Sequence, residues 1–111
     1  MKARILLLSL AAVPVLMSHA AAQSTGKDLY DANCKKCHGV IGTPAKALKA
    51  KFPKLMPFDA DFNAKNNVDA IVTILTKGKG EDMKSFKATL SPAQMKSVAE
   101  YVKELAARPR S

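Results

Sequence analysis

Two cysteines and a histidine are the residues of this sequence whose types and spacing could do chemistry. Cys34, Cys37 and His38 form the run Cys-Lys-Lys-Cys-His. A Cys-x-x-Cys-His run is the attachment signature of c-type haem. On one helical turn, two thiols at this spacing can reach the two vinyl groups of the porphyrin, and the adjacent imidazole is carried under the iron. The run therefore predicts one haem c, bound covalently through Cys34 and Cys37, with His38 as an iron ligand.

Three other uses of these residues compete with haem attachment. A redox-active dithiol with this spacing is typical of a strand-helix-strand context, which the sequence does not indicate. A structural zinc site needs four ligands, and only Cys34, Cys37 and His38 are available if His19 leaves with an N-terminal signal. A plain disulfide would leave His38 without a role. Haem attachment is the interpretation that uses all three residues.

A haem iron held by His38 needs a second axial ligand or keeps an open site. A methionine ligand raises the reduction potential and suits electron transfer. Met83 lies 45 residues after His38, whereas Met56 follows it by only 18 residues. A loop this far from His38 can present its sulfur to the opposite haem face, which favours Met83 over Met56. Met95 lies on the apolar stripe of the last predicted helix and is expected to be a core residue instead. Without Met83 ligation, the iron would be open to peroxide, oxygen or nitric oxide.

The N-terminus has the pattern of an export signal. Lys2 and Arg4 precede an apolar run over residues 5–17, and small residues follow at 20–22. The apolar run is shorter than the about 20 residues that a membrane span needs. We therefore expect a signal peptide over residues 1–22 and a domain over residues 23–111. The domain would lie in the periplasm or another extracytoplasmic compartment, without stable membrane insertion.

The charge of the chain is strongly positive, with 18 Lys and Arg against 9 Asp and Glu. Nucleic acid is not expected as a partner, because an exported chain rarely meets it and no recognition motif is present. Two interpretations remain: scattered charge that keeps the chain soluble, or lysines that steer the protein to an acidic docking surface on a redox partner. The eight lysines considered for steering are Lys27, Lys35, Lys36, Lys46, Lys49, Lys79, Lys84 and Lys87.

Periodicity and capping residues predict an all-helical chain. The first helix should run from about 26 to 36 after Thr25, and a short one from 44 to 52. Residues 53–67 hold prolines and polar turn residues and are expected to form a loop. A third helix is predicted over 68–77, and a last one from Pro92 to near Pro109. The 78–90 segment between them should be a loop.

The combined pattern resembles the class I cytochromes c, of the small monohaem bacterial and algal kind. The resemblance rests on these segments: 26 and 30, 34–39, 44–49, 78–80, 83–86, 90–94 and 98–102. It implies the cytochrome c fold, with three to four helices wrapped around one covalently attached haem. It also implies a monomeric one-electron carrier rather than an enzyme. An electron-entry subunit of a larger exported oxidoreductase is the alternative.

The resemblance further implies roles for single residues. His38 and Met83 would be the two axial ligands, and the Pro44 carbonyl would accept a hydrogen bond from His38. Gly26 and Tyr30 would meet the last helix near Val98 and Tyr101. Lys84 departs from the proline that often follows the ligand methionine in such proteins.

Overall fold

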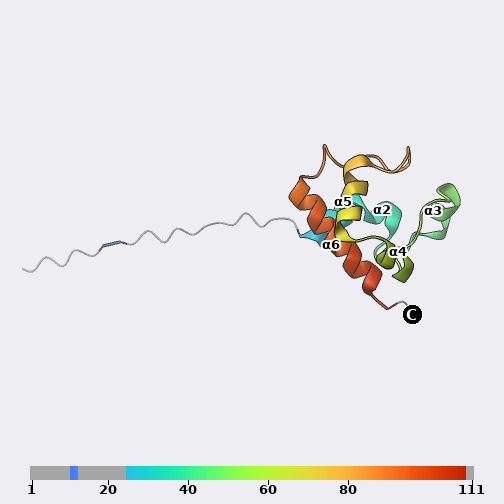
Figure 1. Cartoon of the computed structure of the whole chain (residues 1–111), viewed down its shortest axis with the longest axis horizontal. Helices are drawn as coiled ribbons and strands as arrows, with labels where there is room; N and C mark the ends of the chain where they lie inside the picture. Colours follow the sequence, from blue (N-terminus) through green and yellow to red (C-terminus); the bar gives the residue numbers. More distant parts are fainter. Residues whose placement is uncertain (1–10, 13–24, 110–111) are drawn as a thin grey trace, which may run out of the picture.

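The fold is described by a computed structural model, which covers residues 11–12 and 25–109. Its helices are shown in Figure 1 and have these bounds: α1 Gly26–Asn33, α2 Lys35–His38, α3 Lys46–Lys51, α4 Ala60–Lys65, α5 Val68–Lys77 and α6 Pro92–Ala107. The described part of the chain contains no strand, only an isolated bridge between Lys79 and Met83. The prediction of an all-helical chain is confirmed. The expected signal peptide lies outside the described residues, apart from residues 11–12.

The first predicted helix is interrupted at Cys34. Its start is as expected, because the Thr25 hydroxyl accepts from the Asp28 N–H and the Asp28 carboxylate accepts from the Thr25 N–H, both at 3.2 Å. At Cys34 the backbone departs from helical geometry, with φ −122° and ψ −37°. The helix predicted over 26–36 was therefore wrong as one element: α1 ends at Asn33, and the separate turn α2 continues to His38.

The middle of the chain differs most from the sequence-based expectation. The helix predicted over 44–52 is shorter, because Ala45 is extended, with φ −60° and ψ 147°, and keeps Pro44 outside α3. The stretch expected as a loop contains α4. The Asp59 side chain caps α4 by accepting a hydrogen bond from the Phe62 N–H at 3.0 Å. An Asp before a short helical run was the signal that could have located it.

The two helices after residue 66 form as predicted. The Asn67 side chain caps α5 by accepting from the Ala70 N–H at 2.8 Å. Ser91 and Gln94 make a capping box that begins α6, with Pro92 in its first turn. Gly78 ends α5 with φ +74°, a conformation that favours glycine, and a Cβ there would meet the Ser85 nitrogen at 2.7 Å.

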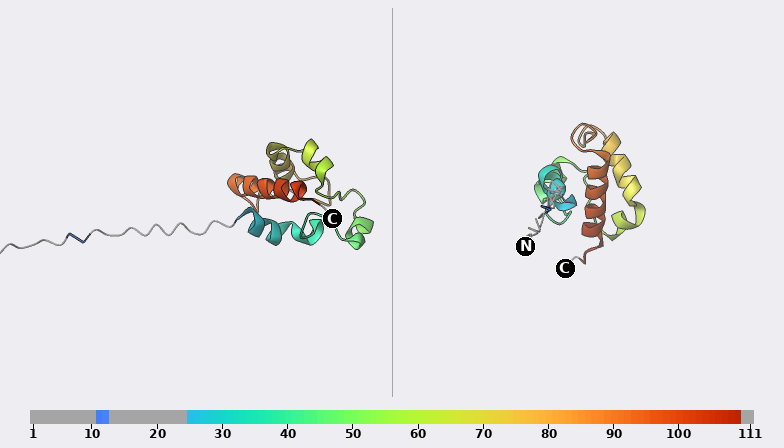
Figure 2. Two further views of the ribbon diagram at one scale, coloured as in Figure 1. Left: turned by 90° about the horizontal axis from the view of Figure 1, so that it is seen from below. Right: turned by 90° about the vertical axis from the view of Figure 1, so that its left-hand side faces the viewer.

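Helix α6 is the centre of the core. Figure 2 shows it between α1 on one side and α4 and α5 on the other. At the α1 crossing, a Cβ on Gly26 would collide with the Ser97 carbonyl, so glycine lets the two backbones approach closely. The Tyr30 and Tyr101 rings meet edge to face at 5.3 Å. The expected meeting of the first and last helices is confirmed. None of the described helices is long and apolar enough to span a membrane.

Candidate functional site

The Cys-x-x-Cys-His run folds as one tight turn at the end of α1. The Cys34 N–H donates to the Tyr30 carbonyl at 2.8 Å, which fixes the start of the turn on α1. The His38 N–H then donates to the Cys34 carbonyl at 2.9 Å. Both cysteines are free thiols, Cys34 buried and Cys37 exposed. Burial, followed by the neighbouring Cys37, raises the pKa of the Cys34 thiol to about 11. The turn thus brings together the three residues that the motif singled out.

The imidazole of His38 is half-buried and held by an aromatic neighbour. Its ring stacks on Phe58, with centroids 4.7 Å apart and an interplanar angle of 18°. Burial lowers the pKa of His38, which favours the neutral imidazole, the form that ligates a metal. Its Nδ1 atom is buried and has no hydrogen-bond partner. The structure therefore lacks the expected hydrogen bond from the His38 Nδ1 atom to the Pro44 carbonyl. Pro44 itself is buried, six residues further along the chain.

The loop after His38 is shaped by two glycines and an aromatic residue. Gly39 has φ +83° and its carbonyl accepts from the Tyr30 hydroxyl at 2.6 Å. Gly42 has φ +78°, and a Cβ there would meet the Phe58 ring at 2.8 Å. The Phe58 N–H donates to the Gly42 carbonyl at 2.8 Å. Sequence reasoning missed Phe58, whose role depends on this contact between separate segments.

Met83 comes from a different element than the cysteines and His38. It lies on the 78–90 loop, is half-buried and packs against the core. The loop is tied down on both sides of it: the Lys79 N–H donates to the Met83 carbonyl at 2.7 Å, and the Phe86 N–H donates to the Leu75 carbonyl at 2.8 Å. Met56, in contrast, is 63% exposed, and Met95 is a core residue. Of the three methionines after residue 22, Met83 is the one on an anchored loop and half-buried.

These residues fit a covalently attached haem. Two free thiols three residues apart would supply the two attachment points, and the neutral imidazole would offer Nε2 as a nitrogen ligand, while its buried, unpaired Nδ1 keeps an N–H for a hydrogen-bond acceptor. The thioether sulfur of Met83, on an anchored loop, is the candidate for a second donor. Among the described residues, no group of three or more His, Cys, Asp or Glu side chains could hold a bare metal ion.

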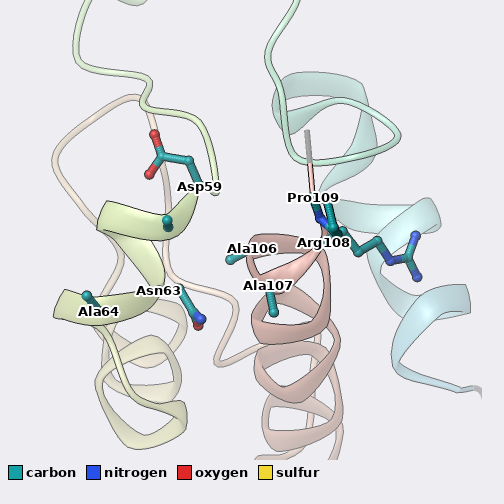
Figure 3. Close-up of a pocket in the computed structure, with 8 residues that line it drawn as sticks. Asp59, Asn63, Ala64, Ala106, Ala107, Arg108 and Pro109 are labelled. Carbon is teal, nitrogen blue, oxygen red and sulfur yellow. The ribbon is translucent and has the colours of Figure 1, made fainter. Parts of the chain in front are cut away.

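The structure also contains a crevice of about 550 Å³ between α4 and the end of α6 (Figure 3). Its lining residues are Asp59, Ala60, Asn63, Ala64, Ala106, Ala107, Arg108 and Pro109. None of the sequence-predicted site residues lines it. The crevice is therefore separate from the Cys-x-x-Cys-His turn.

Comparisons with known proteins place the chain in a family. Residues 21–102 match the family described as cytochrome c oxidase, cbb3-type, subunit III. Cytochrome c6 of Synechocystis is 38% identical over 75% of this chain, which spans 65% of that protein's length. Cytochrome c6 of Leptolyngbya boryana is 38% identical over 74% of this chain and 91% of its own. The solved structure of the KustC0563 c-type cytochrome has a TM-score of 0.66 at 31% identity, covering 74% of this chain and 98% of that one.

The helical fold and the Cys-x-x-Cys-His turn define a haem-binding protein of the c type. The chain belongs to the cytochrome c family, as a small class I c-type cytochrome. Its cofactor is haem c, covalently bound, and the two cysteines of the turn are consistent with that attachment. The chain is a monohaem electron carrier and not an enzyme. The fold class expected from the sequence is confirmed.

Proposed function

We propose that this protein is an exported shuttle, which moves one electron at a time between two redox proteins through a haem ligated by His38 and Met83. When bound, the haem supplies a one-electron iron couple. Cys34 and Cys37 would hold the porphyrin by thioether bonds, and the Nε2 atom of His38 would bind the iron on one face. The sulfur of Met83 would bind it on the other face, from the anchored 78–90 loop.

The observation that supports Met83 as the second iron ligand is the environment of its side chain. It is half-buried against the core, on a loop tied to α5, whereas Met56 is largely exposed. A ligand side chain that is already held in place loses less conformational entropy when the iron binds than a freely moving one does. The carbonyl of Pro44 is the acceptor we propose for Nδ1 of His38 once the imidazole is ligated. That hydrogen bond would fix the ring orientation and raise its basicity.

Export accounts for the N-terminal pattern. We propose that residues 1–22 are a signal peptide and that residues 23–111 form the cytochrome domain outside the cytoplasm. The mature domain would be a monomer, and its lysines would steer it to redox partners with acidic docking surfaces. A role as the electron-entry subunit of a larger oxidoreductase is the second candidate, and the match to the cbb3-type oxidase subunit III family favours it. Size in solution and co-purification separate the two.

The absorption spectrum of the purified haem protein tests the ligand set. We expect a low-spin oxidised haem with a weak far-red band from methionine ligation, lost in Met83→Ala and retained in Met56→Ala. Loss of the band in Met56→Ala alone would assign the ligand to Met56. A high-spin spectrum, or rapid binding of carbon monoxide by the reduced wild-type protein, would favour an open-site haem protein, such as a peroxidase or gas sensor.

A further inference from the structure

The plane of the His38 imidazole is matched by the plane of a neighbouring ring. The Phe58 ring is inclined to it by only 18°, with centroids 4.7 Å apart, a separation typical of offset-stacked aromatic pairs. The stack is formed although the Nδ1 atom of His38 has no hydrogen-bond partner among the described residues. The contact therefore orients the imidazole independently of the hydrogen bond proposed for Nδ1.

Phe58 is itself held from several directions. Its side chain is 9% exposed. Its ring lies 4.8 Å from the ring of Phe62 on α4 and meets the ring of Tyr30 on α1 edge to face at 6.5 Å. Buried side chains in such close packing stay in one rotamer. A ring that cannot turn can restrict the rotation of the ring stacked on it, so the packing of Phe58 is transmitted to His38.

The loop after His38 is built to bring Phe58 close to it. Gly42 is buried with φ +78°, and a Cβ there would lie 2.8 Å from the Phe58 ring. The Phe58 N–H donates to the Gly42 carbonyl at 2.8 Å, which joins the two segments. The Tyr30 hydroxyl donates to the carbonyl of Gly39, the residue directly after His38, at 2.6 Å. The backbone beside His38 is thus fixed from α1, while its ring is oriented by Phe58.

We propose that Phe58 is a positioning residue for the haem centre, which fixes the plane of the His38 imidazole and through that ring tunes the iron. The proposal rests on the ligation by His38 proposed above. Groups that orient a ligating histidine also tune the metal that it binds. The π orbitals of an imidazole stand perpendicular to its ring. The orientation of the ring plane therefore decides in which direction the imidazole interacts with the d orbitals of the iron.

The stack should also favour the oxidised iron. The face of an aromatic ring carries a negative electrostatic potential and attracts positive charge. An iron-bound imidazole carries more positive charge when the iron is ferric than when it is ferrous. Phe58 should therefore stabilise the oxidised state and hold the reduction potential down. Replacing its ring by an aliphatic side chain of similar size should raise the potential.

The sign of this change separates a positioning role from simple packing. Looser packing would admit water, which stabilises the ferric charge and lowers the potential. Phe58→Leu removes the aromatic face but keeps most of the apolar volume. In a spectroelectrochemical titration of the haem-loaded protein, we expect its potential to rise, and that of Phe58→Tyr, which keeps a ring, to stay near the wild-type value. A lower or unchanged potential in Phe58→Leu would overturn the proposal.

Phe62→Leu is the matched control. Phe62 is half-buried and packs against Phe58, so the variant makes the same chemical change one ring further along the aromatic cluster. Its potential should stay close to that of the wild type. Equal rises in Phe62→Leu and Phe58→Leu would mean that the effect comes from the cluster as a whole and not from the stack on His38, which would also overturn the proposal.

Proton NMR of the oxidised, cyanide-bound haem protein reports the ring plane itself. Cyanide takes the place of a methionine ligand and is cylindrically symmetric, so the imidazole plane decides how the unpaired electron spreads over the haem methyl groups. Phe58→Leu should change the order or spread of the methyl shifts, whereas Phe62→Leu should keep the wild-type pattern. An unchanged pattern in Phe58→Leu would refute the positioning role.

This measurement also separates failure of the proposal from failure of the proposed ligand set. The cyanide-bound form does not use Met83, so the methyl pattern tests Phe58 even if another residue is the second ligand. Strongly shifted ring-proton signals of His38 in the wild-type protein should accompany the pattern, because they show that His38 binds the iron. Their absence would refute the ligation by His38 and, with it, the role proposed for Phe58.

Discussion

The ring of Phe58 lies nearly parallel to the imidazole of His38, with centroids 4.7 Å apart and planes inclined by 18°. Phe58 also meets Phe62 at 4.8 Å and approaches Tyr30 edge to face at 6.5 Å. One buried side chain therefore links the haem attachment turn to α4 and α1. Phe58 therefore helps to fix the position of the His38 imidazole.

Truncating the Phe58 side chain should destabilise the protein. Phe58→Ala is expected to lower the free energy of unfolding of the haem-loaded protein by about 3–5 kcal/mol, because it removes a buried ring and leaves a cavity. Urea unfolding followed by far-ultraviolet circular dichroism measures the loss. The control is Phe52→Ala, at the end of α3, where the ring is only half-buried. This variant should lose less than half as much free energy of unfolding as Phe58→Ala. Equal losses for both variants would contradict a supporting role for Phe58.

The close crossing of α1 and α6 depends on the absence of a side chain at Gly26. A Cβ there would run into the Ser97 carbonyl, which is backbone and cannot swing aside. Gly26→Ala should therefore destabilise the protein by about 1–3 kcal/mol, the usual cost of overpacking. The comparison variant Gly80→Ala, where φ is +69° but a Cβ would meet nothing within 4 Å, measures the cost of backbone conformation alone. An unchanged free energy of unfolding in Gly26→Ala would mean that the crossing is not as close as described.

Much of this fold could be predicted from local signals, because caps and apolar stripes act within a few residues. Thr25, Asn67 and Ser91 each begin a helix as their types predict. The break at Cys34 could not be predicted in this way, since it depends on a turn whose hydrogen bonds reach back to Tyr30. The helix α4 was missed because six residues between prolines and asparagines have too little periodicity to stand out.

The candidate site also has a part that the sequence could predict and a part that it could not. Cys34, Cys37 and His38 were predicted from their spacing, and the structure places them on one turn. The surroundings of His38 could not be predicted, because the stacking of Phe58 depends on a hydrogen bond to Gly42, 16 residues earlier in the chain. The roles of Met83 and Pro44 stay predictions.

Haem attachment should be needed for folding. The buried core is modest for a mature chain of this size, and a ligand that binds only the folded state stabilises it by mass action. Expressed without haem, residues 23–111 should show little fixed helix by circular dichroism, whereas the haem-loaded protein should be strongly helical. A well-folded haem-free chain with native-like near-ultraviolet signals would refute this expectation.

The ion pair between Lys27 and Asp31 should be visible in a pH titration. The Lys27 ammonium donates to the Asp31 carboxylate at 2.6 Å, and this hydrogen bond lowers the pKa of Asp31 below its ordinary value of 3.8. The stabilisation is present above the ordinary pKa and is lost as the pH falls through the folded value. Lys27→Met should move the Asp31 midpoint, followed by carboxyl NMR, up toward 3.8. An unmoved midpoint would show that the pair does not persist in solution.

Lys103 joins α6 to the end of α4. Its ammonium donates to the carbonyls of Asn63 and Asn66, at 2.6 and 2.8 Å, where the last turn of α4 leaves carbonyls without helical partners. A cation there also interacts favourably with the helix dipole. Lys103→Met keeps most of the stem but removes the charge and both hydrogen bonds, so it should cost about 1.5–3 kcal/mol of unfolding free energy.

The control for Lys103 lies on the same helix. Lys96 is exposed on α6, and Lys96→Met makes the same chemical change at a solvated position, where substitutions usually shift stability by less than about 0.5 kcal/mol. Hydrogen exchange adds a local measurement: in Lys103→Met, the amides of α4 should exchange faster, while those of α5 should keep their protection, because both hydrogen bonds of the Lys103 ammonium go to the end of α4. Equal acceleration in both helices would mean that the whole fold is loosened, and that Lys103 does not specifically secure α4.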